Sequence, residues 1–219
     1  MMEEKKIDLE LEIEFKSPFH IGSGFNKGKL VDSLVLVDQD GFPYLPASSL
    51  KGRLRANLLS LVNTLEAELD YLNEVCVSEQ KDKKICKNID PTDNCLICRL
   101  FGSAFTPGSL FFSDFKLANS EVLEFIAEAG GIKNFTKHLK TIRSANRIDR
   151  RLKNTVPKAL FDYEVTNHKY KYQGQITGSA YLSDEELKLF KNSLKLITHL
   201  GAKKSRGLGR CEIYEKNKT

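Results

Sequence analysis

The sequence lacks the features that would direct a chain into or across a membrane. No run of apolar residues approaches the roughly 20 that a membrane-spanning helix needs. The first residues, MMEEKKIDLELEIEF, lack the apolar core of a signal peptide. These absences predict a cytoplasmic protein, in which the five cysteines are reduced thiols or metal ligands rather than a disulfide framework.

A phosphate-binding loop of the nucleotide-hydrolase type is also missing, although the stretch GSGFNKGKLVDS (residues 22–33) resembles one at first sight. Such a loop needs two glycines separated by four residues, followed by Lys and then by Ser or Thr. Here five residues separate Gly22 from Gly28, and three separate Gly24 from Gly28. Leu30 follows Lys29, so no hydroxyl is placed for a magnesium ion. The loop must have another purpose.

Neither a long linker nor a low-complexity tract divides the chain, so we expect a single domain over residues 1–219. With 41% apolar and 29% charged residues, the sequence can bury a core of ordinary size. The net charge of +5 is a weak indication of nucleic-acid binding, and the positions of the cations carry more information than their sum.

The spacing of apolar residues predicts an α+β fold. Ile7, Leu9, Leu11, Ile13 and Phe15 alternate with polar residues, which is typical of a half-buried strand. Leucines recur every three or four positions from Leu50 to Leu69, after the helix-start signals Pro46 and Ser48. Ser183 and Glu186 form a capping box ahead of a second amphipathic helix. Further strands are predicted at 31–37, 110–117, 159–165, 170–182 and the C-terminal end, with a short helix at 121–128. This order predicts a ferredoxin-like (RRM-like) βαββαβ core with insertions.

Two loops combine glycines with cations. The first spans Gly22 to Lys29 and the second spans Gly201 to Arg210. Glycine allows close approach of the backbone, whose N–H groups can then meet an anion, although flexible surface turns are the simpler interpretation of either loop. The aromatic RNP submotifs of RNA-recognition modules are missing, so base stacking on the sheet is not indicated.

Four stretches resemble one known family. PYLPASSLKGRLR (43–55) is similar to the signature of the RAMP superfamily, the repeat-associated mysterious proteins of CRISPR systems, and GAKKSRGLGR (201–210) resembles the glycine-rich loop of that superfamily. CRLFGSAFTPGSLFFSDF (98–115) and ANRIDRRLKNTVPKALFDYEV (145–165) resemble blocks of the type III backbone subunits. The resemblance covers nearly the whole chain in the right order, with Ala47 at a position where the family usually has Gly.

The resemblance implies an RNA-binding palm of ferredoxin-like fold with a thumb hairpin that kinks the guide at regular steps. The expected partners are guide CRISPR RNA, complementary target RNA, neighbouring backbone subunits and other type III effector proteins. We expect the thumb in the basic insertion at 131–158, where apolar residues among the cations would pry a base from the stack; a solvated charged face is the simpler alternative. The expected RNA contacts are Lys27, Lys29, Lys51, Arg53, Arg55, Arg143, Arg147, Arg150, Arg151, Lys203, Lys204 and Arg206.

A polar, cysteine-rich insertion at 75–100 holds Cys76, Cys86, Cys95 and Cys98. Cys95 and Cys98 have zinc-knuckle spacing, whereas nine residues separate Cys76 from Cys86, a wider gap than usual. Four thiolates could bind a structural Zn²⁺ and so fasten a segment that is too polar to build its own core, as the resemblance also implies. Independent buried thiols or a redox pair are the alternatives, and His138 or His168 could replace one cysteine. Cys211, in the last predicted strand, is expected in the core.

Asp32 follows the first glycine loop. For a lone Asp, a role in a turn or an ion pair is the default. In the resembling family an Asp at this place cuts target RNA, which predicts a metal-dependent endoribonuclease that uses Mg²⁺ or another divalent ion. The alternatives are a non-catalytic backbone subunit and a stand-alone guide-processing ribonuclease that uses His20. No Tyr or second His lies near His20 in the sequence to support the last of these.

Overall fold

The computed structural model describes residues 2–26, 31–65, 86, 91–149 and 151–216. Within these ranges, no helix is both long and apolar enough to cross a membrane. Cys76, Lys27, Lys29, Arg150 and the last residue of the predicted leucine pattern, Leu69, lie outside the described residues.

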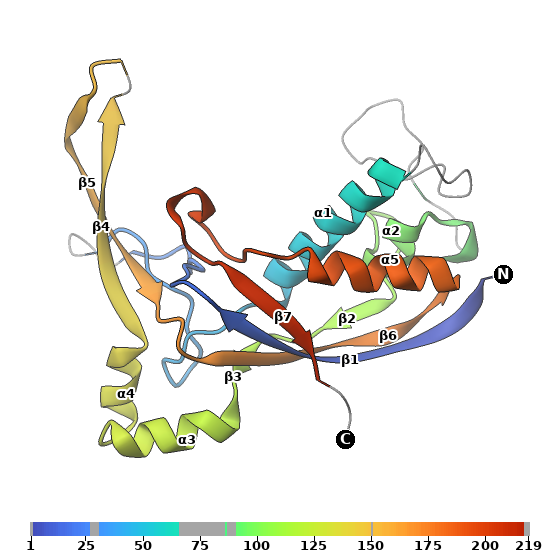
Figure 1. The fold of residues 1–219 in the computed structure, drawn as a ribbon, viewed down its shortest axis with the longest axis horizontal. Coiled ribbons are helices and arrows are strands. Elements are labelled where there is room, and N and C mark those ends of the chain that lie inside the picture. Colours follow the sequence, from blue (N-terminus) through green and yellow to red (C-terminus); the bar gives the residue numbers. More distant parts are fainter. Residues whose placement is uncertain (1, 27–30, 66–85, 87–90, 150, 217–219) are drawn as a thin grey trace.

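One antiparallel sheet forms the centre of the molecule (Figure 1). Its strands are β1 (Glu3–Phe15), β2 (Leu110–Phe112), β3 (Lys116–Leu117), β6 (Lys171–Leu182) and β7 (Cys211–Glu215). The strand order is β2-β6-β1-β7, and β3 pairs with β6 farther along the same edge as β2. With α1 (Ala47–Leu65) between β1 and β2 and α5 (Asp184–Lys195) between β6 and β7, this is the predicted ferredoxin-like fold.

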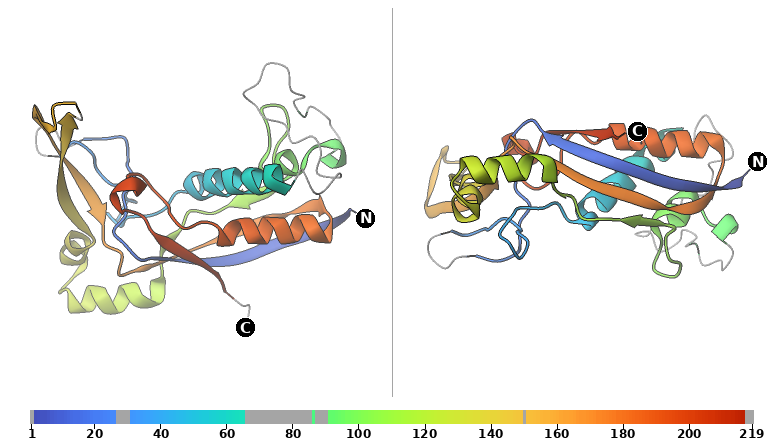
Figure 2. Two further views of the ribbon diagram at one scale, coloured as in Figure 1. Left: turned by 45° about the horizontal axis from the view of Figure 1, so that its top comes forward. Right: turned by 90° about the horizontal axis from the view of Figure 1, so that it is seen from below.

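Both helices cover the same face of the sheet, as the view from below in Figure 2 shows. The alternating apolar residues of β1 point into the core between sheet and helices. Leu50, Leu54, Leu58 and Val62 form the buried stripe of α1, and all four are 0% exposed. The predicted capping box is present: Ser183 Oγ accepts the Glu186 N–H at 3.1 Å, and Glu186 Oε2 accepts the Ser183 N–H at 2.8 Å.

A second, two-stranded antiparallel sheet extends away from the main one (Figure 1). It consists of β4 (Lys140–Asp149) and β5 (Asn154–Thr166), which are preceded by α3 (Asn119–Glu128) and α4 (Ile132–His138). The register shifts between Asn146 and Ile148. This hairpin (residues 140–166) includes much of the basic segment in which the thumb is expected.

Two predicted strands are different in the structure. Residues 31–37 form only isolated bridges, because their partners change along the segment: Ser33 pairs with Tyr163 of β5, Val35 with Gly22 and Val37 with Pro43. The strand predicted at 110–117 is divided into β2 and β3. It is interrupted at Phe115, which leaves β6 and exchanges two backbone hydrogen bonds with Leu45.

Three short helical segments complete the described structure. A 3₁₀ turn (Pro91–Asp93) leads to α2 (Leu96–Phe101), and a second 3₁₀ turn spans Lys204–Arg206 in the glycine-rich loop. Every residue of α2 is buried, which fastens this end of the cysteine-rich insertion to the main core.

Candidate functional site

A cationic cleft lies between the first turns of α1 and the two glycine loops. The cavity, here called the α1 cleft, has a volume of about 520 Å³. Its charged lining residues are Arg53 and Lys204, and Gly52 and Ala56 offer a small-residue surface on α1. The second loop packs against the backbone just before the first loop, because a Cβ on Gly201, whose φ is +90°, would lie 2.6 Å from the His20 carbonyl oxygen. The cleft can therefore bind an anion close to the backbone.

The other two cations of the first α1 turns have contacts outside this cleft. Arg55 Nη1 donates to the Gly102 carbonyl oxygen at 3.2 Å, and so joins α1 to the end of α2. Lys51 Nζ lies 5.9 Å from the centroid of the Phe112 ring. Of the three predicted contacts on this helix, the structure places only Arg53 in the α1 cleft.

The glycine-rich loop is attached to strand β5 through cation–π contacts. Lys203 has a left-handed backbone with φ of 60°, and its Nζ lies 4.7 Å and 4.1 Å from the ring centroids of Phe161 and Tyr163. Arg206 Cζ lies 5.4 Å from the Phe161 centroid. The pKa of Lys203 is lowered, mainly by burial and to a lesser extent by the positive charge of the neighbouring Arg206. Lys203 therefore contributes to the loop–hairpin contact, while Lys204 faces the α1 cleft.

The hairpin exposes large apolar side chains beside its cations. Ile142, Ile148, Leu152 and Leu160 are each 60–65% exposed. Arg143, Arg147 and Arg151 are also exposed. Ile148, Leu160 and Phe161 line a cavity of about 880 Å³ together with Arg147 and Arg206. This is the mixture of apolar surface and positive charge that would contact an unstacked nucleotide.

Asp32 is exposed and lies against β5, at the base of the hairpin. Its backbone N–H donates to the Asp162 carbonyl oxygen at 2.8 Å, and its Oδ2 accepts the Asp162 N–H at 2.8 Å. The Asp162 side chain in turn accepts a hydrogen bond from Ser144 Oγ at 2.5 Å. Asp32 is thus held by the strand that carries Phe161 and Tyr163.

His20 is buried, with 3% of its surface exposed, and both ring nitrogens have partners. Nδ1 lies 2.6 Å from the Glu164 carbonyl oxygen, so it must carry the proton and donate. Nε2 lies 3.1 Å from Ser33 Oγ and accepts from that hydroxyl. The ring also meets Tyr163 edge-on. These contacts favour a structural role for His20 over the general acid–base role that a guide-processing ribonuclease would require.

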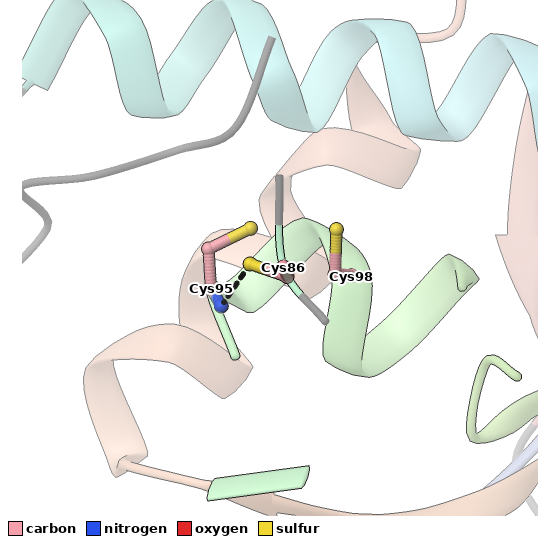
Figure 3. Close-up of side chains that lie close together, drawn as sticks. All are labelled: Cys86, Cys95 and Cys98. Carbon is pink, nitrogen blue, oxygen red and sulfur yellow. Dashed lines mark hydrogen bonds between the residues drawn. The ribbon is translucent and has the colours of Figure 1, made fainter. Parts of the chain in front are cut away.

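Three of the four predicted metal ligands lie together (Figure 3). The Sγ atoms of Cys86, Cys95 and Cys98 all lie within 4.8 Å of one another. A zinc ion with Zn–S distances of about 2.3 Å holds its sulfur ligands about 3.8 Å apart, so small side-chain shifts would suffice to bind one. Cys86 Sγ also accepts the Cys95 N–H at 3.3 Å, a contact that stabilises a thiolate. The three sulfurs fit a metal ion whose fourth ligand comes from elsewhere.

The remaining metal candidates have different positions. Cys76 lies outside the described residues, and neither His138 nor His168 belongs to the described sulfur group. Cys211 is buried in the main core, as predicted, and burial raises the pKa of its thiol to about 12. A thiol in that environment stays protonated near neutral pH, and Cys211 does not belong to the described sulfur group.

The cysteine group is joined to the main fold through a buried ion pair. Arg99, on α2 next to Cys98, bonds to Glu186 and to the Tyr181 carbonyl oxygen. Glu186 is also the capping-box residue of α5. A metal bound at the cysteines would therefore join Cys86 to a helix that Arg99 already holds against α5 and β6.

The profile of the RAMP superfamily matches residues 12–212 of this sequence. The chain belongs to the RAMP superfamily. A relative of this RAMP protein is the CRISPR system Cms endoribonuclease Csm3 of Streptococcus thermophilus, which is 27% identical over 234 residues, covering 97% of this chain and 89% of the relative.

A chain of the type III-B Cmr-beta complex, solved by cryo-electron microscopy with cognate target RNA bound, matches with a TM-score of 0.62 at 13% identity, covering 95% of this chain and 96% of that one. The apo state of Cmr-beta gives a TM-score of 0.54 at 14% identity, covering 95% and 97%. The two structures share the fold of this RAMP protein.

The sequence interpretation missed the side chains of β5 that organise the site. The rings of Phe161 and Tyr163 contact Lys203, whereas the Glu164 side chain, on the alternate face, accepts the Val35 N–H. Asp162 meets Asp32 through its backbone, and its side chain accepts from Ser144. The alternation in FDYEV is a visible signal for two different faces. The partners of these faces come from loops distant in sequence, which the pattern does not reveal.

Proposed function

We propose that this RAMP protein is a guide-RNA-binding backbone subunit of a cytoplasmic type III CRISPR effector complex and that it cuts bound target RNA at Asp32. The near full-length similarity to a CRISPR endoribonuclease supports this proposal. The observation that carries it is the position of Asp32, an exposed carboxylate held at the base of a cationic, apolar-tipped hairpin. Its partners would be the guide RNA, the target RNA, neighbouring copies of the subunit and other effector proteins.

Guide binding would be electrostatic and independent of sequence. Arg53 and Lys204 face the same α1 cleft, with glycines that let a phosphate approach the backbone. The exposed arginines of the hairpin, and Lys27 and Lys29 on the first loop, would contact RNA farther along its path. Because all of these contacts are to phosphates, a change of guide sequence should leave the affinity nearly unchanged.

RNA supplies its own nucleophile for cleavage. The 2′-hydroxyl attacks the adjacent phosphorus and the bond to the 5′-oxygen breaks; the hydroxyl proton is lost and the leaving 5′-oxygen gains one. The products are a 2′,3′-cyclic phosphate and a 5′-hydroxyl. This requires an in-line backbone, which apolar hairpin residues such as Ile148 and Leu152 would impose by separating two bases, so positioning contributes much of the rate.

Asp32 would act at the phosphate through a divalent ion. Oδ2 is held by the Asp162 N–H, and Oδ1 is the oxygen that would bind the ion; carboxylate oxygens are the ligands that Mg²⁺ prefers. A bound Mg²⁺ would neutralise the phosphate charge in the transition state. We favour this role over proton abstraction because exposed carboxylates are weak bases near neutral pH.

Cleavage of complementary RNA by the assembled complex tests the assignment. Asp32→Ala and Asp32→Asn should retain guide and target binding and lose cutting at the positions that this subunit serves. Asp40→Asn, in an exposed turn close in sequence, is the matched control and should cut normally. Wild-type cutting by Asp32→Ala would refute the catalytic role, and cutting that persists in EDTA would refute the metal role alone.

A purely structural subunit is the second candidate. The hydrogen bond between Asp32 Oδ2 and the Asp162 N–H also suits an Asp that only fastens its segment to β5. In that case the complex would bind target RNA without cutting it, and Asp32→Ala would weaken assembly or thermal stability instead.

The cysteine group would hold a structural Zn²⁺, with Cys76 as the fourth ligand of Cys86, Cys95 and Cys98. Thiolates are suitable ligands for zinc, and the three described sulfurs are close enough to share one ion. The ion would fix the insertion against the palm and take no part in RNA cleavage.

A further inference from the structure

The segment that carries Asp32 is held between two parts of the chain. On one side, the Ser23 N–H donates to Leu34 O at 3.0 Å, and the Leu34 N–H donates to Phe25 O at 3.2 Å. On the other side, Asp32 bonds to β5 at Asp162, and the Glu164 N–H donates to Ser33 O at 2.9 Å. The place of Asp32 relative to the hairpin therefore depends on the contact between residues 32–35 and β5.

This contact departs from a regular parallel pair at Val35. In a regular ladder the next hydrogen bond after Glu164 N–H to Ser33 O would run from the Val35 N–H to the Glu164 carbonyl. That carbonyl instead accepts the His20 Nδ1 proton at 2.6 Å. The Val35 N–H donates instead to the side chain of Glu164, at Oε2, over 3.1 Å.

The Glu164 carboxylate therefore substitutes for its own carbonyl. Glu164 uses its N–H, its carbonyl and its carboxylate to hold Ser33, His20 and Val35, respectively. Val35 is a buried residue with 4% of its surface exposed, so its N–H would have no easy alternative partner if the carboxylate were removed. Loss of that oxygen should release one end of the segment from β5.

We propose that Glu164 is a positioning residue for Asp32, an inference that rests on the proposed cleavage of target RNA by Asp32. Glu164 sets the distance between the hairpin, which would splay the RNA, and the carboxylate, which would act on it. It does so through Val35 and Ser33 and does not itself contact the RNA. Because a misplacement of about 1 Å can cost 10²-fold in rate, a loosened segment should slow cleavage without weakening RNA binding.

Three substitutions separate hydrogen bonding from charge. Glu164→Ala removes the acceptor. Glu164→Asp retains the charge but withdraws the oxygens by one methylene, and Glu164→Gln retains an acceptor oxygen at full reach but loses the charge. Glu10→Gln is the matched control, a strand glutamate whose side chain is exposed on β1.

The assay is single-turnover cleavage by the assembled complex with saturating target RNA, with target affinity measured separately. We expect cleavage about ten- to a hundredfold slower for Glu164→Ala and Glu164→Asp, within twofold of wild type for Glu164→Gln and Glu10→Gln, and unchanged target affinity for all four. In the full-length protein, the Val35 amide should exchange with solvent faster in the Asp and Ala variants than in the Gln variant.

If Glu164→Ala fails to assemble, the comparison of Glu164→Asp with Glu164→Gln still tests the inference. Wild-type cleavage by Glu164→Asp, or slow cleavage by Glu164→Gln, would overturn the inference. A failure of the proposed function would appear separately, as wild-type cutting by Asp32→Ala.

Discussion

Removal of one cation from the α1 cleft should change the salt dependence of guide binding by a calculable amount. Each phosphate contact to a single strand contributes about −0.7 to the slope of log affinity against log salt. Arg53→Ala or Lys204→Ala should therefore make this negative slope shallower by about 0.7 and weaken binding about fivefold at 0.1 M salt relative to a 1 M reference. The two residues line the same cavity from different elements. If each contacts its own phosphate, the double variant should have a slope shallower by about 1.4 and bind about 25-fold more weakly at 0.1 M salt.

Titration of a labelled guide RNA between 0.05 and 0.2 M salt measures this effect. The ratio of wild-type affinity to that of each single variant should fall about two- to threefold as the salt concentration rises from 0.05 to 0.2 M. Lys6→Ala removes an exposed cation from β1 and should leave both slope and affinity unchanged. Two guides of unrelated sequence should respond alike. A wild-type slope for both Arg53→Ala and Lys204→Ala would refute the assignment of the α1 cleft to the guide backbone.

Three further predictions concern the metal, the backbone and pH. Protein purified without chelators should contain about one zinc per chain by elemental analysis, and Cys95→Ser should release it and speed hydrogen exchange in α2; no zinc in the wild type would contradict this. Gly209→Ala should lower the melting temperature, because its φ is +76° and the new Cβ would lie 2.0 Å from Leu200 O; strain of this kind costs at least about 1–3 kcal/mol. Burial raises the pKa of Cys211 from 9.0 to about 12, so its contribution to the free energy of unfolding is fully present below pH 9 and declines as pH rises towards 12. Between pH 9 and pH 12, the free energy of unfolding measured by denaturant titration should therefore fall less steeply with pH in Cys211→Ala than in the wild type. An equal fall in the two proteins would contradict the raised pKa of the buried thiol.

The sequence was sufficient to predict the strands and helices that have a clear apolar periodicity or a cap formed by residues close in the chain. The alternation in β1, the leucine stripe of α1 and the capping box of α5 each depend on residues a few positions apart. The structure confirms the first and the last, and it confirms the helix as far as Leu65, with Leu50, Leu54 and Leu58 buried. The order of these elements then leaves few topologies, of which the ferredoxin-like sheet is one. The core position of Cys211 was also predictable from its place in the last predicted strand.

The contacts that organise the candidate site came only from the tertiary structure. Residues 31–37 have the composition of a strand, but they divide their hydrogen bonds between residues 21–25 and β5, and so form no regular strand. Lys51, Arg53 and Arg55 look equivalent in sequence, yet the helix directs them to three different surroundings. Lys203 and Lys204 are adjacent, but the left-handed backbone at Lys203 brings its side chain over the rings of β5 while Lys204 faces the α1 cleft. Glu164 meets Val35 although 129 positions separate them. Local pattern determines which residues form strands and helices, whereas the partner of each polar side chain depends on packing between segments distant in the chain.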